Sequence, residues 1–183
     1  MKRRAEQEAQ TRLRITESAM ELHGTLGPAR TSVKAVADHA GVPRSTVYRH
    51  FPDEEALFGA CSQHWAEQNP APDIERWGAI ADPDERLATG LDELYAYYGR
   101  THAMLDKLHR DEETVPVVGQ FFQAFHGFLA AARDVLAGPR ASRRRRAAIG
   151  HAVAYTTWRS LTQEQQLGDK QAAGLMLRLV AEA

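Results

Sequence analysis

The apolar residues of this chain recur with the 3.6-residue period of α-helices, and no stretch alternates between apolar and polar positions as a half-buried strand does. The first predicted helix covers about residues 11–26, and Gly27 and Pro28 stop it. Its apolar side chains share one face: Ile15, Ala19, Leu22 and Leu26. The pattern along the whole chain predicts an all-α protein with about nine helices.

Two short helices with a glycine turn between them are predicted next. Thr31 or Ser32 can cap the first of them, and its apolar residues recur at helical spacing. Gly41 follows at once, where a helix end favours a residue that adopts positive φ. Pro43 suits the first position of the next helix, about residues 43–50, which is too short to be stable alone. This layout is that of a helix-turn-helix.

The second of these short helices exposes a polar face. Val47 and Phe51 lie four residues apart and are expected to point inward, which leaves mostly polar side chains outside. Arginine can donate two hydrogen bonds to guanine, and hydroxyl groups can bond to bases or phosphates. The sequence therefore predicts a DNA-binding face with backbone anchors at the start of the preceding helix. The predicted set is Thr31, Ser32, Lys34, Arg44, Ser45, Thr46, Tyr48, Arg49 and His50.

Residues 11–60 resemble the amino-terminal domain of the TetR (tetracycline repressor) family of bacterial regulators. The resemblance rests on Thr31, Val36-Ala37, Ala40-Gly41-Val42, Ser45-Thr46, Tyr48-Arg49-His50-Phe51, Glu55 and Leu57. It implies a three-helix DNA-binding domain, followed by a helical domain that binds a small molecule and dimerises. On this interpretation residues 1–57 form the DNA-binding domain, and residues 58–183 form the ligand-binding and dimerisation domain.

One position departs from the family pattern. The family usually places a lysine in the first turn of the fourth helix, where it often touches a phosphate. This chain has Glu54 there, which would repel a phosphate, so binding is expected to depend more on Lys34, Arg49 and an amino-terminal arm. Residues 1–12 are predicted to form that arm, frayed and polar, which either reaches DNA or only solubilises the chain. Its cations are Lys2, Arg3, Arg4 and Arg12.

Asp53 is predicted to cap the fourth helix, and Asn69 and Pro70 are predicted to end it. The segment 69–82 has the composition of a linker. Trp77 within it is expected either to fold back on the core or to cover a pocket.

Only helices are predicted after this linker. A capping box at residues 82–85 begins one of them, and this helix is expected to break at residues 99–101. Pro116 begins the next. The last two are predicted over about residues 141–165 and 169–181.

The second domain is rich in aromatic residues, and the resemblance implies a small-molecule pocket among its helices. A pocket lined by such side chains with a few polar groups would bind an apolar or aromatic ligand. An acidic surplus at residues 73–115 gives a weak indication of a cationic one instead. Each candidate side chain is also explained by core packing alone. The candidates are Tyr95, Tyr98, His102, Met104, Phe121, Phe122, Phe125, His126, Tyr155 and Trp158.

Two consecutive amphipathic helices at the carboxyl end can pair with those of a second copy as a four-helix bundle. The resembled family dimerises in this way, which places two recognition helices on a palindromic operator of double-stranded DNA. The residues predicted to form this interface are Val153, Leu161, Ala172, Met176 and Leu179.

Composition adds few constraints. The formal net charge is −1, yet residues 1–50 hold nine Lys and Arg against five Asp and Glu, which favours an anionic partner at that end. Cys61 is the single cysteine, so neither a disulfide nor a cysteine-based zinc site is expected, and this fits the cytoplasm. No signal peptide is predicted, and the apolar stretch 115–136 is too polar for a membrane span.

The sequence contains no HExxH, no GxSxG and no glycine-rich phosphate loop, so no enzyme, metal or cofactor is predicted. The expected function is that of a homodimeric transcription regulator, most simply a repressor that a small-molecule effector releases from DNA. Two alternatives stay open. One is a DNA-binding regulator whose second domain only dimerises. The other is a carrier or enzyme with a vestigial helix-turn-helix. The effector, the operator, the regulated genes and the sign of regulation are not encoded in any pattern of the sequence.

Overall fold

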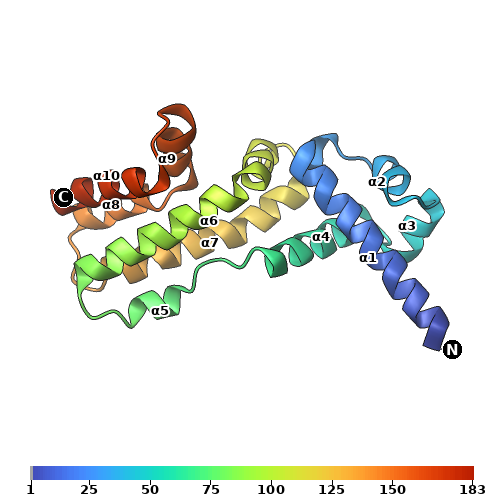
Figure 1. Ribbon diagram of the computed structural model, residues 1–183, viewed down its shortest axis with the longest axis horizontal. Coiled ribbons are helices and arrows are strands. Elements are labelled where there is room, and N and C mark those ends of the chain that lie inside the picture. Colours follow the sequence, from blue (N-terminus) through green and yellow to red (C-terminus); the bar gives the residue numbers. More distant parts are fainter. Residues whose placement is uncertain (1) are drawn as a thin grey trace. The chain divides into compact units, whose positions relative to one another are not determined.

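The computed structural model describes residues 2–183, and within this range it is helical, without a strand. Figure 1 shows the helices in chain order, and the all-α prediction is confirmed. Residues 2–183 form ten α-helices, one 3-10 turn (η1) and one π-helical turn (η2). They are α1 (Lys2–Thr25), η1 (Pro28–Arg30), α2 (Val33–Ala40), α3 (Arg44–His50), α4 (Glu54–Gln68), α5 (Ile74–Gly78), α6 (Pro83–Asp111), α7 (Pro116–Ala137), α8 (Arg143–Ala152), α9 (Tyr155–Arg159), η2 (Ser160–Glu164) and α10 (Asp169–Ala181).

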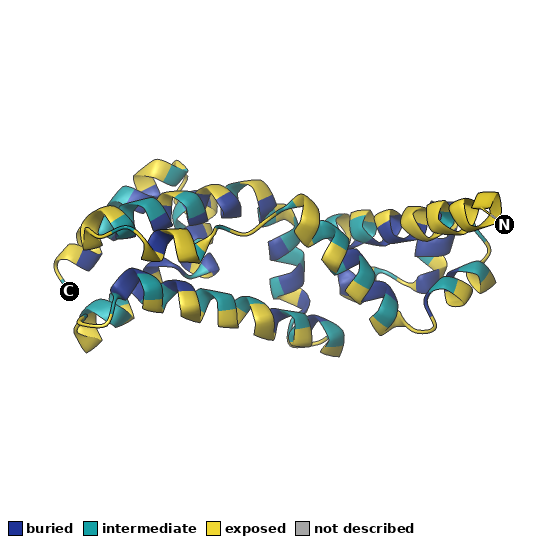
Figure 2. Cartoon of the chain, turned by 90° about the horizontal axis from the view of Figure 1, so that it is seen from below, coloured by how far each residue is buried: buried dark blue, intermediate teal, exposed yellow. Residues whose placement is uncertain are grey.

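The helices form two compact units. The first holds the chain up to Pro70 together with Ala103–Phe122, and the second holds Ala71–His102 together with Gln123–Ala183. Helices α6 and α7 therefore each supply residues to both units. In each unit the buried residues lie along the inward sides of the helices, as Figure 2 shows by colour. The functional boundary predicted after residue 57 stays a prediction.

The helix-turn-helix forms as the sequence predicts. Ser32 caps α2, and its Oγ accepts a hydrogen bond from the backbone N–H of Ala35 at 3.1 Å. Gly41 ends α2 with φ of 63°, a left-handed conformation that glycine adopts without steric cost. Pro43 is the extended residue before α3 rather than its first helical residue. Helix α1 packs against α2, α3 and α4, and it thereby fixes the three-helix arrangement.

The frayed arm predicted at the amino end is wrong, because α1 is helical from Lys2 onward. Alanine, glutamate, glutamine and arginine dominate this segment, and all four are good helix formers. Arg4 and Glu8, one turn apart, add an ion pair at 3.4 Å. Every side chain from Lys2 to Gln10 is exposed, so these first turns extend beyond the core of the unit.

The predicted linker contains a short helix, α5, and Trp77 in it folds back on the core. The indole is fully buried, and its Nε1–H donates to Glu93 Oε2 at 2.8 Å. Asp73 caps α5, with its carboxylate accepting from the N–H groups of Glu75 and Arg76. The segment is therefore an ordered part of the second unit.

Helix α6 runs without interruption through residues 99–101, so the predicted break there is wrong. The hydroxyl of Thr101 donates to the carbonyl of Tyr97, one turn back, at 2.6 Å. Gly99 leaves room for Asp169, whose Oδ2 lies 2.8 Å from the position that a Cβ would take. A glycine inside a helix costs about 1 kcal/mol relative to alanine, and packing on the surrounding helices outweighs that cost.

A single helix was predicted over residues 141–165, but the chain bends at Val153 and Ala154, between α8 and α9. Two buried tyrosines take up the carbonyl groups that this bend releases. The hydroxyl of Tyr95 donates to Ala152 O at 2.9 Å, and that of Tyr98 donates to Val153 O at 2.7 Å. A buried carbonyl group without a hydrogen-bond partner is destabilising, so these two bonds allow the chain to bend inside the core.

Candidate nucleic-acid interface

Helix α3 presents the polar face that the sequence predicts. Val47 is buried inside the first unit with 1% of its surface exposed, and Phe51, which follows the helix, is buried to the same degree. The outward side chains divide by exposure. Arg44, Ser45, Tyr48 and Arg49 are exposed, whereas Thr46 and His50 are half-buried.

Arg44 and Tyr48 form an ordered pair on this face. Arg44 Nη2 donates to the Tyr48 hydroxyl at 2.9 Å, and the guanidinium carbon lies 5.4 Å from the centre of the tyrosine ring. The tyrosine oxygen accepts this bond, so its own proton stays available to a phosphate. The guanidinium likewise keeps further N–H groups for a base edge. The pair is thus ordered before any DNA arrives, which lowers the entropy lost on binding.

The predicted anchors at the start of α2 differ in whether their hydrogen-bond donors are still available to a phosphate. The hydroxyl of Thr31 donates to Gly27 O at 2.8 Å, so its proton is already used within the chain. Ser32 Oγ accepts a backbone bond and retains its proton. Lys34 pairs with Asp38 at 3.2 Å, but both side chains are well exposed, and such pairs contribute little. A phosphate can therefore take the place of Asp38 at Lys34.

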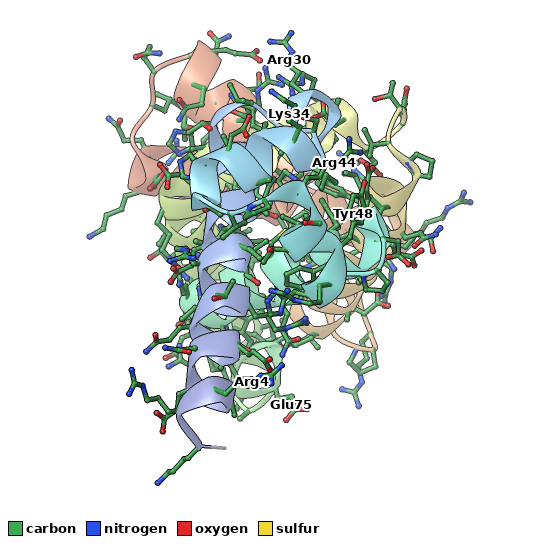
Figure 3. The ribbon with its side chains drawn as sticks, turned by 90° about the vertical axis from the view of Figure 1, so that its right-hand side faces the viewer. Arg4, Arg30, Lys34, Arg44, Tyr48 and Glu75 are labelled. Atoms are coloured by element: carbon green, nitrogen blue, oxygen red, sulfur yellow. The ribbon has the colours of Figure 1, made fainter. Side chains whose placement is uncertain are left out.

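Figure 3 shows Arg30, Lys34, Arg44 and Tyr48 along the same side of the first unit. Arg30, the last residue of η1, is exposed and was missed in the sequence-based set. The sequence could have indicated Arg30, because it is a cation two residues before Ser32, the cap of α2. The exposed surface formed by Arg30, Lys34, Arg44, Tyr48 and Arg49 is called the α2–α3 surface below.

His50 differs from the other predicted contacts on α3. Its Nε2 atom is buried and has no hydrogen-bond partner among the described residues. That nitrogen cannot reach a phosphate without a rotation of the ring. The prediction that His50 holds DNA therefore rests on its Nδ1 atom or on such a rotation.

Glu54 lies where the sequence placed it, in the first turn of α4. Asp53 caps this helix by accepting the Ala56 N–H at 2.7 Å, and Glu54 is exposed beside it. Glu54 also lines a small cavity together with Thr31 and Ser32. A carboxylate therefore lies near two of the predicted anchors, where a negative charge would oppose a phosphate.

The ten residues predicted to line a pocket divide into separate groups. Five of them form one aromatic cluster in the second unit: Tyr95, Tyr98, His102, Tyr155 and Trp158. The rings of Tyr155 and Trp158 stack with centroids 5.5 Å apart, and Tyr98 meets Tyr155 edge-on at 5.2 Å. Burial raises the pKa of the Tyr95 and Tyr98 hydroxyls, so both stay protonated and donate to their carbonyl partners.

The other five lie elsewhere. Met104 and Phe121 line a narrow apolar cavity in the first unit. The centre of a water molecule can occupy only about 10 Å³ of this cavity, so it holds about one water and no larger molecule. Phe122 is buried beside it, and its ring lies 6.4 Å from that of Phe121. In the second unit Phe125 stacks on Phe128, and His126 lines a shallow surface hollow. The pocket drawn from the sequence stays a prediction.

Cys61 is a buried, packed side chain in the wall of the same narrow cavity as His23. The Sγ atom lies 3.3 Å from His23 Nδ1 and donates to Phe58 O at 3.1 Å. Burial raises the pKa of the Cys61 thiol to about 12 and lowers the pKa of His23 to about 4. At neutral pH both groups are therefore uncharged, and the thiol is a poor nucleophile.

The residues predicted to form a dimer interface differ in their exposure. Val153, Ala172 and Met176 are buried within their own chain. Leu161 is partly exposed, and Leu179 on α10 has 50% of its surface exposed. Only the last two side chains are thus positioned to contact a second copy.

The run of arginines that begins α8 makes contacts within its own chain. Arg145 bonds to Asp84 at 3.1 Å, and Arg146 bonds to Asp134 at 2.7 Å. Arg133 and Arg146 together hold the pKa of the Asp134 carboxyl below its usual range. Acidic partners for this run are therefore found on α6 and α7 of the same chain.

Among residues 2–183 no group of three or more His, Cys, Asp or Glu side chains is arranged to hold a metal ion. No helix in the same range is long and apolar enough to cross a membrane.

Comparison with known proteins identifies what the first unit is similar to. Residues 15–61 match the bacterial regulatory proteins of the tetR family. A curated relative, the HTH-type transcriptional regulator AcrR of Shigella flexneri, is 42% identical over 59 residues. That match covers 32% of this chain and only about a quarter, 27%, of the length of the relative.

Solved structures match over nearly the whole chain. A TetR-like transcriptional regulator from Rhodococcus sp. RHA1 has a TM-score of 0.66 and 18% identity, with 93% of each chain covered. The transcriptional regulator FadR from Bacillus subtilis, solved in complex with stearoyl-CoA, has a TM-score of 0.62 and 18% identity. That alignment covers 92% of this chain and 96% of the other. At these identities the structures establish the shared fold.

Proposed function

We propose that the chain is a DNA-binding transcription regulator of the TetR family, which its residues 15–61 match, and specifically a repressor that a small-molecule effector releases from its operator. The observation that carries the proposal is the α2–α3 surface. It combines exposed cations, a hydroxyl group and an ordered Arg44–Tyr48 pair on a helix-turn-helix. Such a face can read base edges and neutralise phosphates at the same time.

The regulator acts as a homodimer in the cytoplasm on this proposal. One α3 helix is too small to select a site in a genome, whereas two copies read both halves of a palindromic operator. The exposed Leu179 on α10 and the partly exposed Leu161 support an interface at the carboxyl end of the chain.

Helix α6 supplies the route from an effector to the DNA-binding helices. It carries Tyr95 and Tyr98 of the aromatic cluster in its middle, and Arg110 and Asp111 at its end. Arg110 Nη2 donates to Leu26 O at 3.0 Å, and Asp111 Oδ2 accepts from the N–H of Ala29 at 2.9 Å. These bonds fasten the end of α6 to the turn that leads into α2, so a displacement of α6 would reach α2 and α3.

Gly27 makes this contact possible. Its φ of 93° is unfavourable for other residues, and a Cβ there would collide with the Arg110 guanidinium and the Asp111 carboxylate. The salt bridge to Arg110 holds the pKa of Asp111 below its usual range, so the carboxylate is charged at neutral pH.

The proposal is tested by gel retardation of the DNA that lies upstream of the protein's own gene. Wild-type protein is expected to retard this DNA at fixed salt, and Arg44→Ala is expected to lose most of the effect while remaining folded. Salt must be held constant because it weakens any such complex. A panel of apolar and aromatic molecules is then added, with stearoyl-CoA included because it occupies the Bacillus subtilis regulator. Release of the DNA by one of them supports the effector mechanism.

A second candidate is a regulator whose second unit only dimerises. The aromatic cluster favours it, because Tyr95, Tyr98 and Trp158 are almost completely buried and their polar atoms are already bonded inside the chain. A complex with DNA that no molecule of the panel releases would support this candidate. If wild-type protein retards no DNA at all, both candidates fail, and a carrier or enzyme with a vestigial helix-turn-helix becomes the better account.

A further inference from the structure

We propose that Arg12 is a positioning residue for the recognition helix: its guanidinium holds the carboxyl end of α3 in place and does not serve as a phosphate contact. The inference rests on the proposed DNA-binding function of α3. It assigns a different role to a residue that sequence reasoning placed among the cations of an amino-terminal arm.

Two contacts join Arg12 to the end of α3. Its Nη1 donates to the backbone carbonyl of His50 at 2.6 Å, across 38 residues of sequence. Its guanidinium carbon also lies 4.2 Å from the centre of the Phe51 ring. Phe51 is almost completely buried, so this ring is a fixed platform. One planar cation therefore contacts the last residue of α3 and the residue that follows it.

The end of α3 needs such support. The helix has only seven residues, far fewer than an isolated helix needs to be stable. The last carbonyl groups of a helix lack partners within it and carry partial negative charge. Beyond the helix, the Phe51 N–H returns to the last turn by donating to Val47 O at 2.9 Å. A cation that bonds to the His50 carbonyl satisfies one of these groups and favours the helical state of the last turn.

This contact bears on the α2–α3 surface because Tyr48 and Arg49 belong to that last turn. If the turn frays, the side chains of Tyr48 and Arg49 lose their fixed direction. Ordering them then costs free energy when DNA binds, which weakens binding. The competing role for Arg12 is a direct contact to a phosphate. The Arg12 residue is exposed, so the experiment must separate the two roles.

The first arm measures amide hydrogen exchange in the DNA-free protein. Arg12→Gln is expected to speed exchange of the Phe51 amide severalfold, because the last turn of α3 opens more often. Arg14→Gln is the matched control: it removes the same charge from the exposed surface of α1, two residues away and on a different face. No change is expected there. Thermal unfolding of each variant verifies that it is folded.

The second arm measures DNA affinity against salt. Arg12→Gln is expected to lower affinity about tenfold at fixed salt and to leave the slope of log K on log[salt] unchanged. Loss of a phosphate contact would instead reduce that slope by about 0.9. Arg12→Lys is expected to restore affinity only in part, since lysine keeps the charge but not the planar group that lies over Phe51.

The assignment would be overturned if the Phe51 amide of Arg12→Gln exchanged at the wild-type rate. It would also be overturned if Arg12→Gln reduced the slope of log K on log[salt] and Arg12→Lys fully restored DNA affinity. If wild-type protein binds no DNA, the proposed function fails instead. The exchange arm then still decides whether Arg12 holds the end of α3.

Discussion

Tyr48 in the α2–α3 surface and Tyr98 in the aromatic cluster are the same residue type in opposite settings. Tyr48 is 38% exposed, and its hydroxyl accepts a bond from Arg44, one turn earlier on the same helix. Tyr98 is fully buried, and its hydroxyl donates to Val153 O, 55 residues away in sequence. The first environment is set by neighbours in the sequence, and the second by helices that meet only in the folded chain.

This difference separates two kinds of effect. A side chain of the α2–α3 surface has little to do with the core, so its loss should lower DNA affinity and leave stability unchanged. A side chain of the aromatic cluster satisfies a buried backbone group, so its loss should lower stability first.

Replacing Arg44 by alanine should produce the largest effect. The guanidinium can make two hydrogen bonds with a guanine, and each such contact contributes about 1–3 kcal/mol of binding free energy. Operator affinity at fixed salt is expected to fall about 5- to 160-fold, with the melting temperature unchanged. Fluorescence anisotropy with labelled DNA measures the affinity. Equal affinity of variant and wild type would show that Arg44 does not contact DNA.

The pH dependence of stability tests a buried titratable group in the core of the first unit, His23. Burial lowers the pKa of His23 from 6.5 to about 4 in the folded chain, against a smaller opposing effect of Asp111. The unfolded chain therefore binds a proton that the folded chain does not, and stability falls as the pH drops from about 6.5 to 4. Between pH 7 and pH 5 this group alone should lower the free energy of unfolding by about 2 kcal/mol.

Urea unfolding at the two pH values measures this change. In His23→Gln, which cannot titrate, the difference between pH 7 and pH 5 should shrink by that amount. An identical pH difference in the variant would show that His23 is not protonated differently in the two states.

The matched pair Tyr98→Phe and Tyr48→Phe removes one hydroxyl from each region. Tyr98→Phe leaves the buried Val153 carbonyl without its donor and is expected to cost about 1–2 kcal/mol of stability, with the DNA affinity of the folded protein unchanged. Tyr48→Phe should leave stability unchanged and weaken binding. Urea unfolding and anisotropy are run on both variants. Parallel losses in both assays for both variants would show that the two regions do not act separately.

Lys34→Gln should produce the smallest change. Its pair with Asp38 is exposed and weak, so stability should hold, and affinity should fall only severalfold. The characteristic result is the salt dependence. The slope of log K on log[salt] should decrease in magnitude by about 0.9, as expected for one lost phosphate contact. A slope equal to that of wild type would place Lys34 outside the DNA contacts.

The part of the fold that the sequence predicted is the part set by local chemistry. The Ser32 cap, the Gly41 turn and the inward pair Val47 and Phe51 each depend on residues within a few positions, and all of them form. The polar face of α3 follows from the same spacing. Helical period and capping residues also placed α4 and α7 closely.

What was missed depends on partners far away in sequence. Gly99 lies inside α6, and Asp169 occupies the space that a side chain at this position would need, a contact that no local pattern records. The bend after Val153 depends on a tyrosine from α6, and the role of Arg12 depends on a carbonyl 38 residues away. Nine of the ten predicted pocket residues have aromatic or imidazole rings, but this shared ring character does not show that the folded chain distributes them over separate groups.

Selection of DNA from a random library by the immobilised full-length protein, followed by sequencing, tests the central claim most directly. If the α2–α3 surface reads DNA, wild-type protein should enrich one sequence arranged as an inverted repeat, and Arg44→Ala should lose the enrichment at one position of each half-site. Failure of the folded wild-type protein to enrich any sequence, or enrichment that Arg44→Ala leaves unchanged, would contradict the claim.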